Sequence, residues 1–249
     1  MNAVAFFFAS ICFLHLNGNK TDPNSSTSIS YPKQTKEINL PHGYERIKLP
    51  AESFGVFLRK QPLKKETTVY LYNGQPKYNQ TAQYAVLDVS VGKRDLQQCA
   101  DAVMRLRAEY LKQQQLSICF ADNAGKKYCW EQYKNRGWQS YLETVFGMCG
   151  TLSLEKELKP KTWDQVTVGD VLIKGGSPGH AVIIMDLARH RQTGDLIFLL
   201  AQSYMPAQDI HILQNKNEKM LSPWYRVPKA NIISTPEWTF YANQLRSWR

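Results

Sequence analysis

Apolar residues follow a helical spacing in the first half of the chain and form short runs typical of strands in the second half. The clearest predicted helix covers residues 96–110, where Cys99, Val103 and Leu106 fall on one side. Asp95 stands where it would cap the first turn of this helix. Three shorter helices are predicted at residues 53–60, 138–146 and 154–158.

Four apolar runs in the C-terminal half follow one another with short Gly-, Pro- or Asp-containing loops between them. Short loops between strands favour an antiparallel meander, and a helix packed on such a sheet gives an α+β domain. The four runs lie at residues 170–173, 181–187, 196–202 and 210–213. Further strands are predicted at residues 67–72, which end in an Asn73-Gly74 turn, and at residues 84–91 and 115–120.

The first residues have the pattern of a targeting segment. Residues 3–16 are apolar apart from His15, which is too short for a membrane span but typical of the central part of a signal peptide. Residues 1–17 are therefore interpreted as a leader, residues 18–40 as a flexible linker and residues 41–249 as one α+β domain. We expect export to the periplasm or cell surface, with either leader cleavage or a lipid anchor on Cys12, and no transmembrane span in the mature chain.

Composition favours a globular protein with a basic surface. The 249 residues are 43% hydrophobic and 12% aromatic, which is enough for a core. Basic residues number 31 against 21 acidic ones, and they are scattered along the chain. This net charge of +10 fits either an ordinary soluble surface or attraction to an anionic envelope surface or glycan. Because the chain has no nucleic-acid-binding signature, we expect no nucleic acid partner.

Four cysteines follow the leader: Cys99, Cys119, Cys129 and Cys149. They allow three full pairings, between which the sequence does not choose, although Cys119 and Cys129 flank a turn and could close a hairpin. Their spacing is not that of a zinc site, and we expect no metal and no other cofactor. A metal-dependent hydrolase built on His180, Asp186 and His211 is a distant alternative, because these residues lack a known ligand spacing.

Cys99 and His180 are the candidate catalytic pair. Cys99 lies near the start of the predicted helix, whose dipole is expected to lower its thiol pKa, and His180 opens an apolar strand after a Gly/Pro loop. Gln202, on the following strand, is predicted to orient the imidazole. The backbone amide of Cys99 and the Gln98 side chain are candidate oxyanion donors. Predicted cleft residues are Ser177, Ser203 and Tyr204.

The order of these parts resembles the papain-like cell-wall hydrolases of the NlpC type and the CHAP amidases. The matching stretches are Gln98-Cys99-Ala100, Gly169-Asp170-Val171-Leu172, Gly179-His180-Ala181-Val182-Ile183 and Leu200-Ala201-Gln202-Ser203. The resemblance implies a papain-like arrangement of helices on an antiparallel sheet. It also implies a thiol hydrolase of amide bonds, with cell-wall peptide crosslinks as the substrate.

Over its whole length the chain also resembles a family of exported bacterial proteins with a domain of unknown function, for which no activity is implied. The matching stretches are residues 96–111, 150–158 and 201–208. A second hypothesis is therefore a non-catalytic envelope module that binds a glycan, a peptide or a protein. It is motivated by Gln-Cys-Ala-Asp at residues 98–101, where the papain-like enzymes have Asp-Cys-Ser-Gly.

Overall fold

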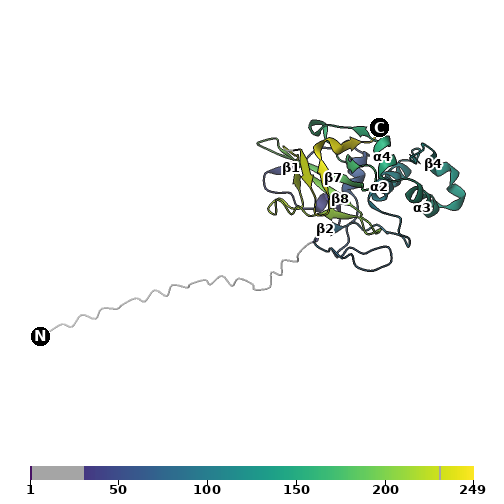
Figure 1. Cartoon of the computed structure of the whole chain (residues 1–249). Helices are drawn as coiled ribbons and strands as arrows, with labels where there is room; N and C mark the ends of the chain where they lie inside the picture. Colours follow the sequence, from purple (N-terminus) through teal and green to yellow (C-terminus); the bar gives the residue numbers. More distant parts are fainter. Residues whose placement is uncertain (2–30, 230) are drawn as a thin grey trace. The chain divides into compact units, whose positions relative to one another are not determined.

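The computed structural model describes residues 1, 31–229 and 231–249, and residues 32–249 form one compact unit (Figure 1). The helices are α1 (Phe54–Arg59), α2 (Cys99–Gln113), α3 (Trp138–Met148) and α4 (Thr151–Glu157), with 3-10 turns η1 (Thr35–Glu37), η2 (Trp130–Gln132), η3 (Lys134–Arg136), η4 (Trp163–Gln165) and η5 (Ala242–Gln244). The strands are β1 (Tyr44–Arg46), β2 (Gln83–Val86), β3 (Cys119–Ala121), β4 (Lys127–Cys129), β5 (Lys159–Pro160), β6 (Val171–Lys174), β7 (His180–His190), β8 (Leu196–Gln202), β9 (His211–Leu213), β10 (Tyr225–Arg226), β11 (Ile232–Ser234), β12 (Thr239–Tyr241) and β13 (Leu245–Ser247).

The predicted antiparallel meander is confirmed as the sequence of strands β6, β7, β8 and β9, each paired with the next. They form the centre of a nine-stranded sheet, which β2 extends beyond β9 and β13 and β5 extend beyond β6. Helix α2 packs on β7 and β8, while α1 packs on β7 and α4 on β6. The protein is therefore α+β, with helices packed against a large antiparallel sheet, as the sequence predicts.

Strand β7 is buried along most of its length, from His180 to Ala188. Strand β8 is likewise buried from Ile197 to Gln202. Neither strand alternates between apolar and polar residues, which is the pattern of strands covered on both faces. The centre of the sheet is therefore the core of the protein, and His180 and Gln202 stand at the ends of its two most buried strands.

Helix α2 begins at Cys99, and its N-cap is Gln98 instead of the predicted Asp95. The backbone N–H of Gln98 donates to the Asp101 carboxylate over 3.0 Å. Asp95 accepts two other hydrogen bonds, from the Gln98 side chain over 3.1 Å and from the backbone N–H of Ala207 over 2.7 Å. Asp95 therefore ties the segment that follows β8 to the start of α2, which brings the two parts of the candidate site together.

A disulfide joins Cys119 and Cys129, whose backbones pair directly across the β3–β4 hairpin. Cys99 and Cys149 are free. Each of the three full pairings that the sequence left open needs two bridges, so none of them is complete here. The Cys119–Cys129 bridge, which the sequence placed across a turn, is formed. Helix α3 and strand β4 lie on the side of α2 away from the sheet (Figure 1).

The strand predicted at residues 67–72 is wrong, although the turn after it is present. Only isolated bridges form there, between Tyr70 and Pro76 and between Leu71 and Gln208. The reason lies in the Gln80 side chain, which bonds both the N–H and the C=O of Val69, over 3.1 and 2.9 Å. Since a neighbouring strand would need these same groups, the segment remains a loop.

Residues 32–40, assigned above to the linker, lie in the compact unit. Thr35 is fully buried, with its backbone N–H donating to the carbonyl of Gln61 just after α1, and Ile38 is 1% exposed and belongs to the hydrophobic core. The predicted leader, the possible lipid site Cys12 and residues 18–30 of the predicted linker lie outside the described residues. Within the described ranges, no helix is both long and apolar enough to cross a membrane.

Candidate active site

Cys99 and His180 line one cavity of about 590 Å³. Cys99 is the first residue of α2 and His180 is the first residue of β7, so two element ends meet there. The rest of the wall comes from other residues around the start of α2, from the loop at residues 176–179, from the junction of α3 and α4, and from Tyr204, Met205 and Trp238. Sequence reasoning therefore selected two residues, 81 positions apart, that face the same space.

The Cys99 thiol is partly buried, and this changes its expected ionisation. Burial raises the pKa of Cys99 to about 11, an effect to which the nearby Asp101 charge adds. The backbone N–H group of Ala181 in β7 lowers this pKa, as do those of Ala100 and Cys99 at the start of α2, but together they do not offset the loss of solvation. The predicted lowering of the thiol pKa is therefore wrong, and Cys99 is a neutral thiol at pH 7.

His180 is 1% exposed and is surrounded by aromatic rings. The ring centroids of Tyr204, Trp238 and Phe240 lie 4.8, 5.3 and 5.8 Å from that of His180. Burial lowers the pKa of His180 to about 4, although the hydrogen bond with Gln202 and the charge of Glu237 oppose this. The imidazole is therefore neutral at pH 7 and able to accept a proton.

Gln202 lies behind His180, away from the cavity. Its Oε1 atom is 2.9 Å from His180 Nε2. Among the described residues, His180 Nδ1 has no hydrogen-bond partner, and no hydrogen bond joins the ring to the Cys99 sulfur. The second nitrogen of the ring is thus left available on the residue that lines the cavity with Cys99.

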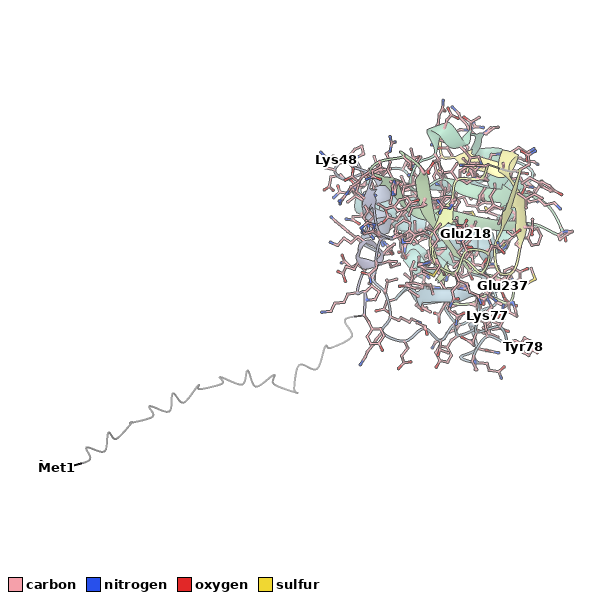
Figure 2. The ribbon with its side chains drawn as sticks, turned by 90° about the vertical axis from the view of Figure 1, so that its left-hand side faces the viewer. Met1, Lys48, Lys77, Tyr78, Glu218 and Glu237 are labelled. Atoms are coloured by element: carbon pink, nitrogen blue, oxygen red, sulfur yellow. A yellow bond between two sulfur atoms is a disulfide. The ribbon has the colours of Figure 1, made fainter. Side chains whose placement is uncertain are left out.

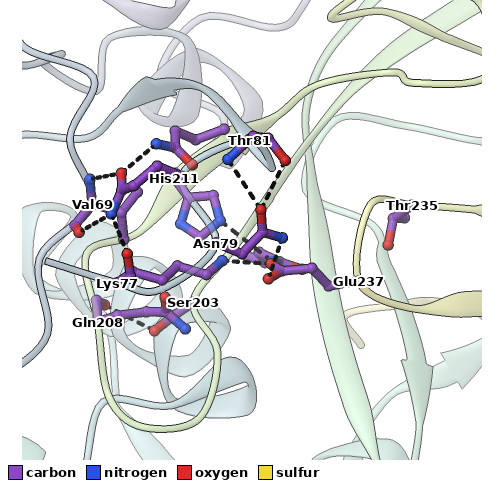
Figure 3. Close-up of polar contacts among 12 residues, drawn as sticks. Val69, Lys77, Asn79, Thr81, Ser203, Gln208, His211, Thr235 and Glu237 are labelled. Atoms are coloured by element: carbon purple, nitrogen blue, oxygen red, sulfur yellow. Dashed lines mark hydrogen bonds and ion pairs between the residues drawn. The ribbon is translucent and has the colours of Figure 1, made fainter.

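A buried polar network continues beyond Gln202. The Gln202 amide nitrogen lies 2.7 Å from Glu237 Oε2 and 3.3 Å from His211 Nε2. Glu237 also pairs with Lys77 over 2.5 Å, and its other oxygen accepts from Asn79 over 3.1 Å (Figure 3). Lys77 and Glu237 lie side by side at one end of the molecule (Figure 2).

The remaining predicted site residues divide into two groups. Gln98, Ser177 and Tyr204 line the cavity. One N–H of the Gln98 amide is engaged by Asp95, which leaves the other free to face a ligand. Ser203 is fully buried, with its hydroxyl in contact with the backbone carbonyls of Gln97 and Gln208, and it is not part of the cavity wall.

His180, Asp186 and His211, the residues of the alternative metal-dependent hydrolase, do not form one cluster. Asp186 is fully buried and pairs with Arg46 and Arg59, over 2.6 and 2.5 Å. His211 belongs instead to the network behind Gln202. In the part of the chain that the structure covers, no group of three His, Cys, Asp or Glu side chains is placed to hold a metal ion.

A second large cavity, of about 640 Å³, opens beside Trp163 and Tyr225. Its described wall contains carboxylates and two basic side chains, but neither cysteine nor histidine. A free cysteine and a histidine therefore line the first cavity and not this one.

Sequence reasoning missed the outer members of the network, Lys77, Asn79 and Glu237. Lys77 and Asn79 lie in the segment after the Asn73-Gly74 turn, and Glu237 lies between two short strands near the C-terminus. Each is an ordinary polar residue in a polar stretch, so no local pattern marks it. His211 gave the only signal, because it stands as a single polar residue between Ile210 and Ile212.

The cavity and the network define an α+β protein with a cysteine, a histidine and an amide side chain in one constellation. The chain belongs to the family described as Domain of unknown function (4846), which it matches over residues 35–137 and 126–247. This confirms the resemblance to a domain family of unknown function. A search of the curated proteins found no match, and a search of the solved structures found none. The relationship to papain-like hydrolases is supported by no match and remains a proposal.

Proposed function

We propose that this protein is a thiol hydrolase of amide bonds, with Cys99 as nucleophile, His180 as general base and then acid, and Gln202 as the residue that orients the imidazole. One observation carries the proposal. A free thiol and a neutral imidazole line the same cavity, and the imidazole is held from behind through Nε2. The bridge between Cys119 and Cys129 leaves the candidate nucleophile out of disulfide pairing, which also supports it.

The proposed chemistry begins with two neutral partners. The Cys99 proton passes to His180 Nδ1 as the sulfur attacks the carbonyl carbon of the substrate amide. His180 then returns the proton to the leaving nitrogen, the C–N bond breaks and a thioester forms. A water molecule, deprotonated by His180, hydrolyses the thioester and restores the thiol. The Cys99 backbone N–H and the free N–H of the Gln98 amide are the proposed donors to the oxyanion.

The proposed substrate is a peptide crosslink of the cell wall. The support is the order of the Cys99, His180 and Gln202 segments along the chain, which resembles that of the NlpC and CHAP groups. The cavity volume of about 590 Å³ is in the usual range for small-molecule sites and suits a short peptide stem. Export of the protein, through the leader at residues 1–17 or with a lipid on Cys12, would place it beside this substrate.

The first test is alkylation by iodoacetamide at pH 7, followed site by site by mass spectrometry. Cys149 is an internal control, because it is also a free thiol on the cavity wall and burial raises its pKa to about 12. We expect His180→Ala to slow the alkylation of Cys99 at least about tenfold and to leave that of Cys149 unchanged, since general-base assistance is worth about 10²-fold or more. Equal Cys99 rates in the parent protein and His180→Ala would overturn the proposal.

The second test concerns the substrate. Isolated cell-wall peptidoglycan is incubated with the protein or with Cys99→Ala, and newly released amino groups are identified by mass spectrometry. We expect release by the parent protein only. If alkylation depends on His180 but no crosslink is cut, the thiol hydrolase stands and the cell-wall substrate is wrong.

A non-catalytic binding module is the second candidate, and one observation favours it. The pKa of about 11 keeps Cys99 in its less reactive thiol form, which suits a structural cysteine as well as a nucleophile. In that case, Cys99→Ala would bind peptidoglycan fragments as tightly as the parent protein, and neither would cut them. A sedimentation assay with whole peptidoglycan distinguishes this outcome from hydrolysis.

A further inference from the structure

The orientation of Gln202 decides which nitrogen of His180 carries the proton. An amide side chain has nearly the same shape when its oxygen and nitrogen are exchanged, so its neighbours fix its orientation. If Gln202 presents Oε1 to His180 Nε2, that nitrogen must donate, and Nδ1 keeps its lone pair for the Cys99 proton. If Gln202 presents its NH₂ group, Nε2 must accept and Nδ1 carries the proton, which leaves no base for the thiol.

Glu237 is the first neighbour that fixes this orientation. An ionised carboxylate only accepts hydrogen bonds, and Glu237 Oε2 lies 2.7 Å from the Gln202 nitrogen. Burial raises the pKa of Glu237, but the hydrogen bond and charge of Lys77 outweigh this and hold the pKa below its ordinary value. Glu237 is therefore ionised at pH 7 and requires the NH₂ group of Gln202 to face it.

His211 is the second neighbour, and it acts through its own tautomer. His211 Nδ1 lies 2.9 Å from the backbone carbonyl of Asp209, which only accepts, so Nδ1 must donate. Burial lowers the pKa of His211 to about 4, so the ring is neutral at pH 7 and its Nε2 has a lone pair. This Nε2 lies 3.3 Å from the Gln202 nitrogen and accepts the second N–H of the amide.

Both N–H groups of Gln202 therefore have acceptors on the side away from His180. The oxygen is left for His180 Nε2, at 2.9 Å. The direction of donation runs without conflict. The Lys77 ammonium donates to Glu237, a contact that Figure 3 shows, and the Gln202 amide donates to Glu237 and His211. In the reversed orientation, the amide oxygen would face two acceptors, the Glu237 carboxylate and the lone pair of His211 Nε2, and neither would receive a hydrogen bond from Gln202.

We propose that Glu237 and His211 are positioning residues, which set the His180 tautomer by fixing the Gln202 amide. Neither residue lines the cavity, so neither acts on a substrate directly. The effect of Glu237 and His211 on catalysis rests on the proposed function, whereas the assignment of the His180 tautomer does not. In a nucleophile–base pair the wrong histidine tautomer costs about 10⁴-fold in rate, as known for a serine protease triad, which makes the positioning consequential.

The test reads the tautomer directly, by NMR of the full chain labelled with ¹⁵N-histidine. Long-range proton–nitrogen correlations distinguish an imidazole protonated on Nε2 from one protonated on Nδ1, and the His180 signals are assigned from their absence in His180→Ala. The variants are Glu237→Gln, His211→Phe and their combination. Glu237→Asp keeps an acceptor-only carboxylate, and Asn79→Ala removes a neighbour of Glu237 that does not touch Gln202.

We expect His180 in the parent protein to carry its proton on Nε2. The combined variant should shift a substantial fraction to Nδ1, while Glu237→Asp and Asn79→Ala stay as the parent. Glu237→Gln leaves Lys77 without its charge partner, so Lys77→Met with Glu237→Gln replaces it if the single variant fails to fold. An unchanged tautomer in the folded combined variant would overturn the positioning role.

Iodoacetamide alkylation of Cys99 at pH 7 is measured on the same samples, and it separates the two proposals. If the tautomer shifts and the Cys99 rate falls at least about tenfold, both proposals are supported. If the tautomer shifts while the Cys99 rate is the same in every variant, including His180→Ala, the positioning role stands and the thiol hydrolase fails. If the rate depends on His180 but the tautomer never moves, the hydrolase stands and the positioning role fails.

Discussion

Gly179 is the residue on which the placement of His180 most directly depends. A Cβ atom at this position would lie 2.3 Å from the Gly176 carbonyl oxygen and 2.9 Å from that of Lys174. It would also lie 2.5 Å from the Thr151 hydroxyl. Two of these atoms belong to the backbone, so no side-chain rotation relieves the contact. The glycine is required here for close approach of two chain segments, next to the candidate base.

We therefore predict that Gly179→Ala lowers the free energy of unfolding by about 1–3 kcal/mol, the usual cost of overpacking. It should also slow iodoacetamide alkylation of Cys99, because the loop must shift beside His180. The matched control is Gly147→Ala, on the wall of the same cavity, where a Cβ meets nothing within 4 Å and the helix gains about 0.5–1 kcal/mol. Equal stability of the two variants in urea unfolding would contradict this prediction.

At the residue scale, the sequence predicted the inner part of the candidate site and not its outer part. Cys99, His180 and Gln202 each follow from a local pattern, namely a helix start, a Gly/Pro loop and a strand end. Glu237 has no such pattern, because its role depends on a neighbour, Gln202, from a distant strand. The thiol pKa was also wrong from sequence, since the loss of solvation depends on which segments cover the sulfur.

At the element scale, β7 connects the candidate site to the N-terminal segment. It begins at His180 and carries Asp186 at an irregularity in its pairing with β8. The Asp186 carboxylate is fully buried and pairs with Arg46 of β1 and Arg59 of α1. One strand therefore positions the imidazole at its start and anchors two N-terminal elements at its middle.

We predict that Asp186→Asn lowers the free energy of unfolding by about 2–4 kcal/mol, because two partly buried guanidinium groups lose their counter-charge. The control is Glu45→Gln, whose pairing with Arg191 is exposed on both sides and should be worth about 0–1 kcal/mol. Denaturant unfolding of both variants measures the difference. A loss no larger in Asp186→Asn than in Glu45→Gln would show that the buried pairs contribute nothing.

The β3–β4 hairpin is the element that the disulfide stabilises. It is only two three-residue strands, which pair with one another apart from the large sheet. A hairpin of this size is marginal in water without further support. The Cys119–Cys129 bridge supplies this support beside α3 and leaves the two free thiols at the cavity.

We predict that replacing Cys119 and Cys129 together by alanine lowers the free energy of unfolding by about 2–3 kcal/mol, as expected for a short closed loop. Alkylation of Cys99 at pH 7 should stay within about twofold of the parent, since neither bridged residue lines that cavity. Mass spectrometry of the unreduced parent after denaturation should find Cys99 and Cys149 alkylated, and Cys119 and Cys129 not alkylated. Alkylation of Cys119 and Cys129 would show that the bridge is absent in solution.

The helices and the central meander were predicted well because their apolar runs are long and their ends carry glycine or proline. The helix at residues 53–60 is α1, with Ser53 as its cap, and the helices at residues 138–146 and 154–158 are α3 and α4. The short strands β5, β10 and β13 were missed. Each has two or three residues and exists only through pairing with a strand distant in sequence, which no local pattern reveals.

At the scale of the whole molecule, the two buried histidines of the network give stability a pH dependence. Burial lowers the pKa of both His180 and His211 to about 4, below the unfolded value of about 6.5. Below pH 6.5 the unfolded chain binds protons that the folded chain does not, so protonation favours unfolding. Stability is therefore fully present above about pH 6.5 and declines as the pH falls towards about 4.

We predict that the free energy of unfolding falls between pH 7 and pH 4 by about 3 kcal/mol for each of the two histidines, as an upper limit. Urea unfolding at pH 7, 6, 5 and 4 measures this. His211→Phe should lose about half of the dependence, because it removes one of the two groups. Equal slopes in the parent and in His211→Phe would show that His211 is not responsible.

The C-terminal segment has a consequence for when the thiol becomes reactive. Glu237 follows His180 by 57 positions in the sequence, whereas Lys77, its partner, precedes Cys99 by 22. A polypeptide that has been synthesised only up to a point before Glu237 already contains Cys99 and His180. It lacks the carboxylate that fixes the Gln202 amide, and Gln202 in turn sets the tautomer of His180. On the mechanism proposed here, a partly synthesised chain that stops before Glu237 would contain the thiol and the imidazole without being active, and proteolytic loss of the segment that carries Glu237 would inactivate the folded protein.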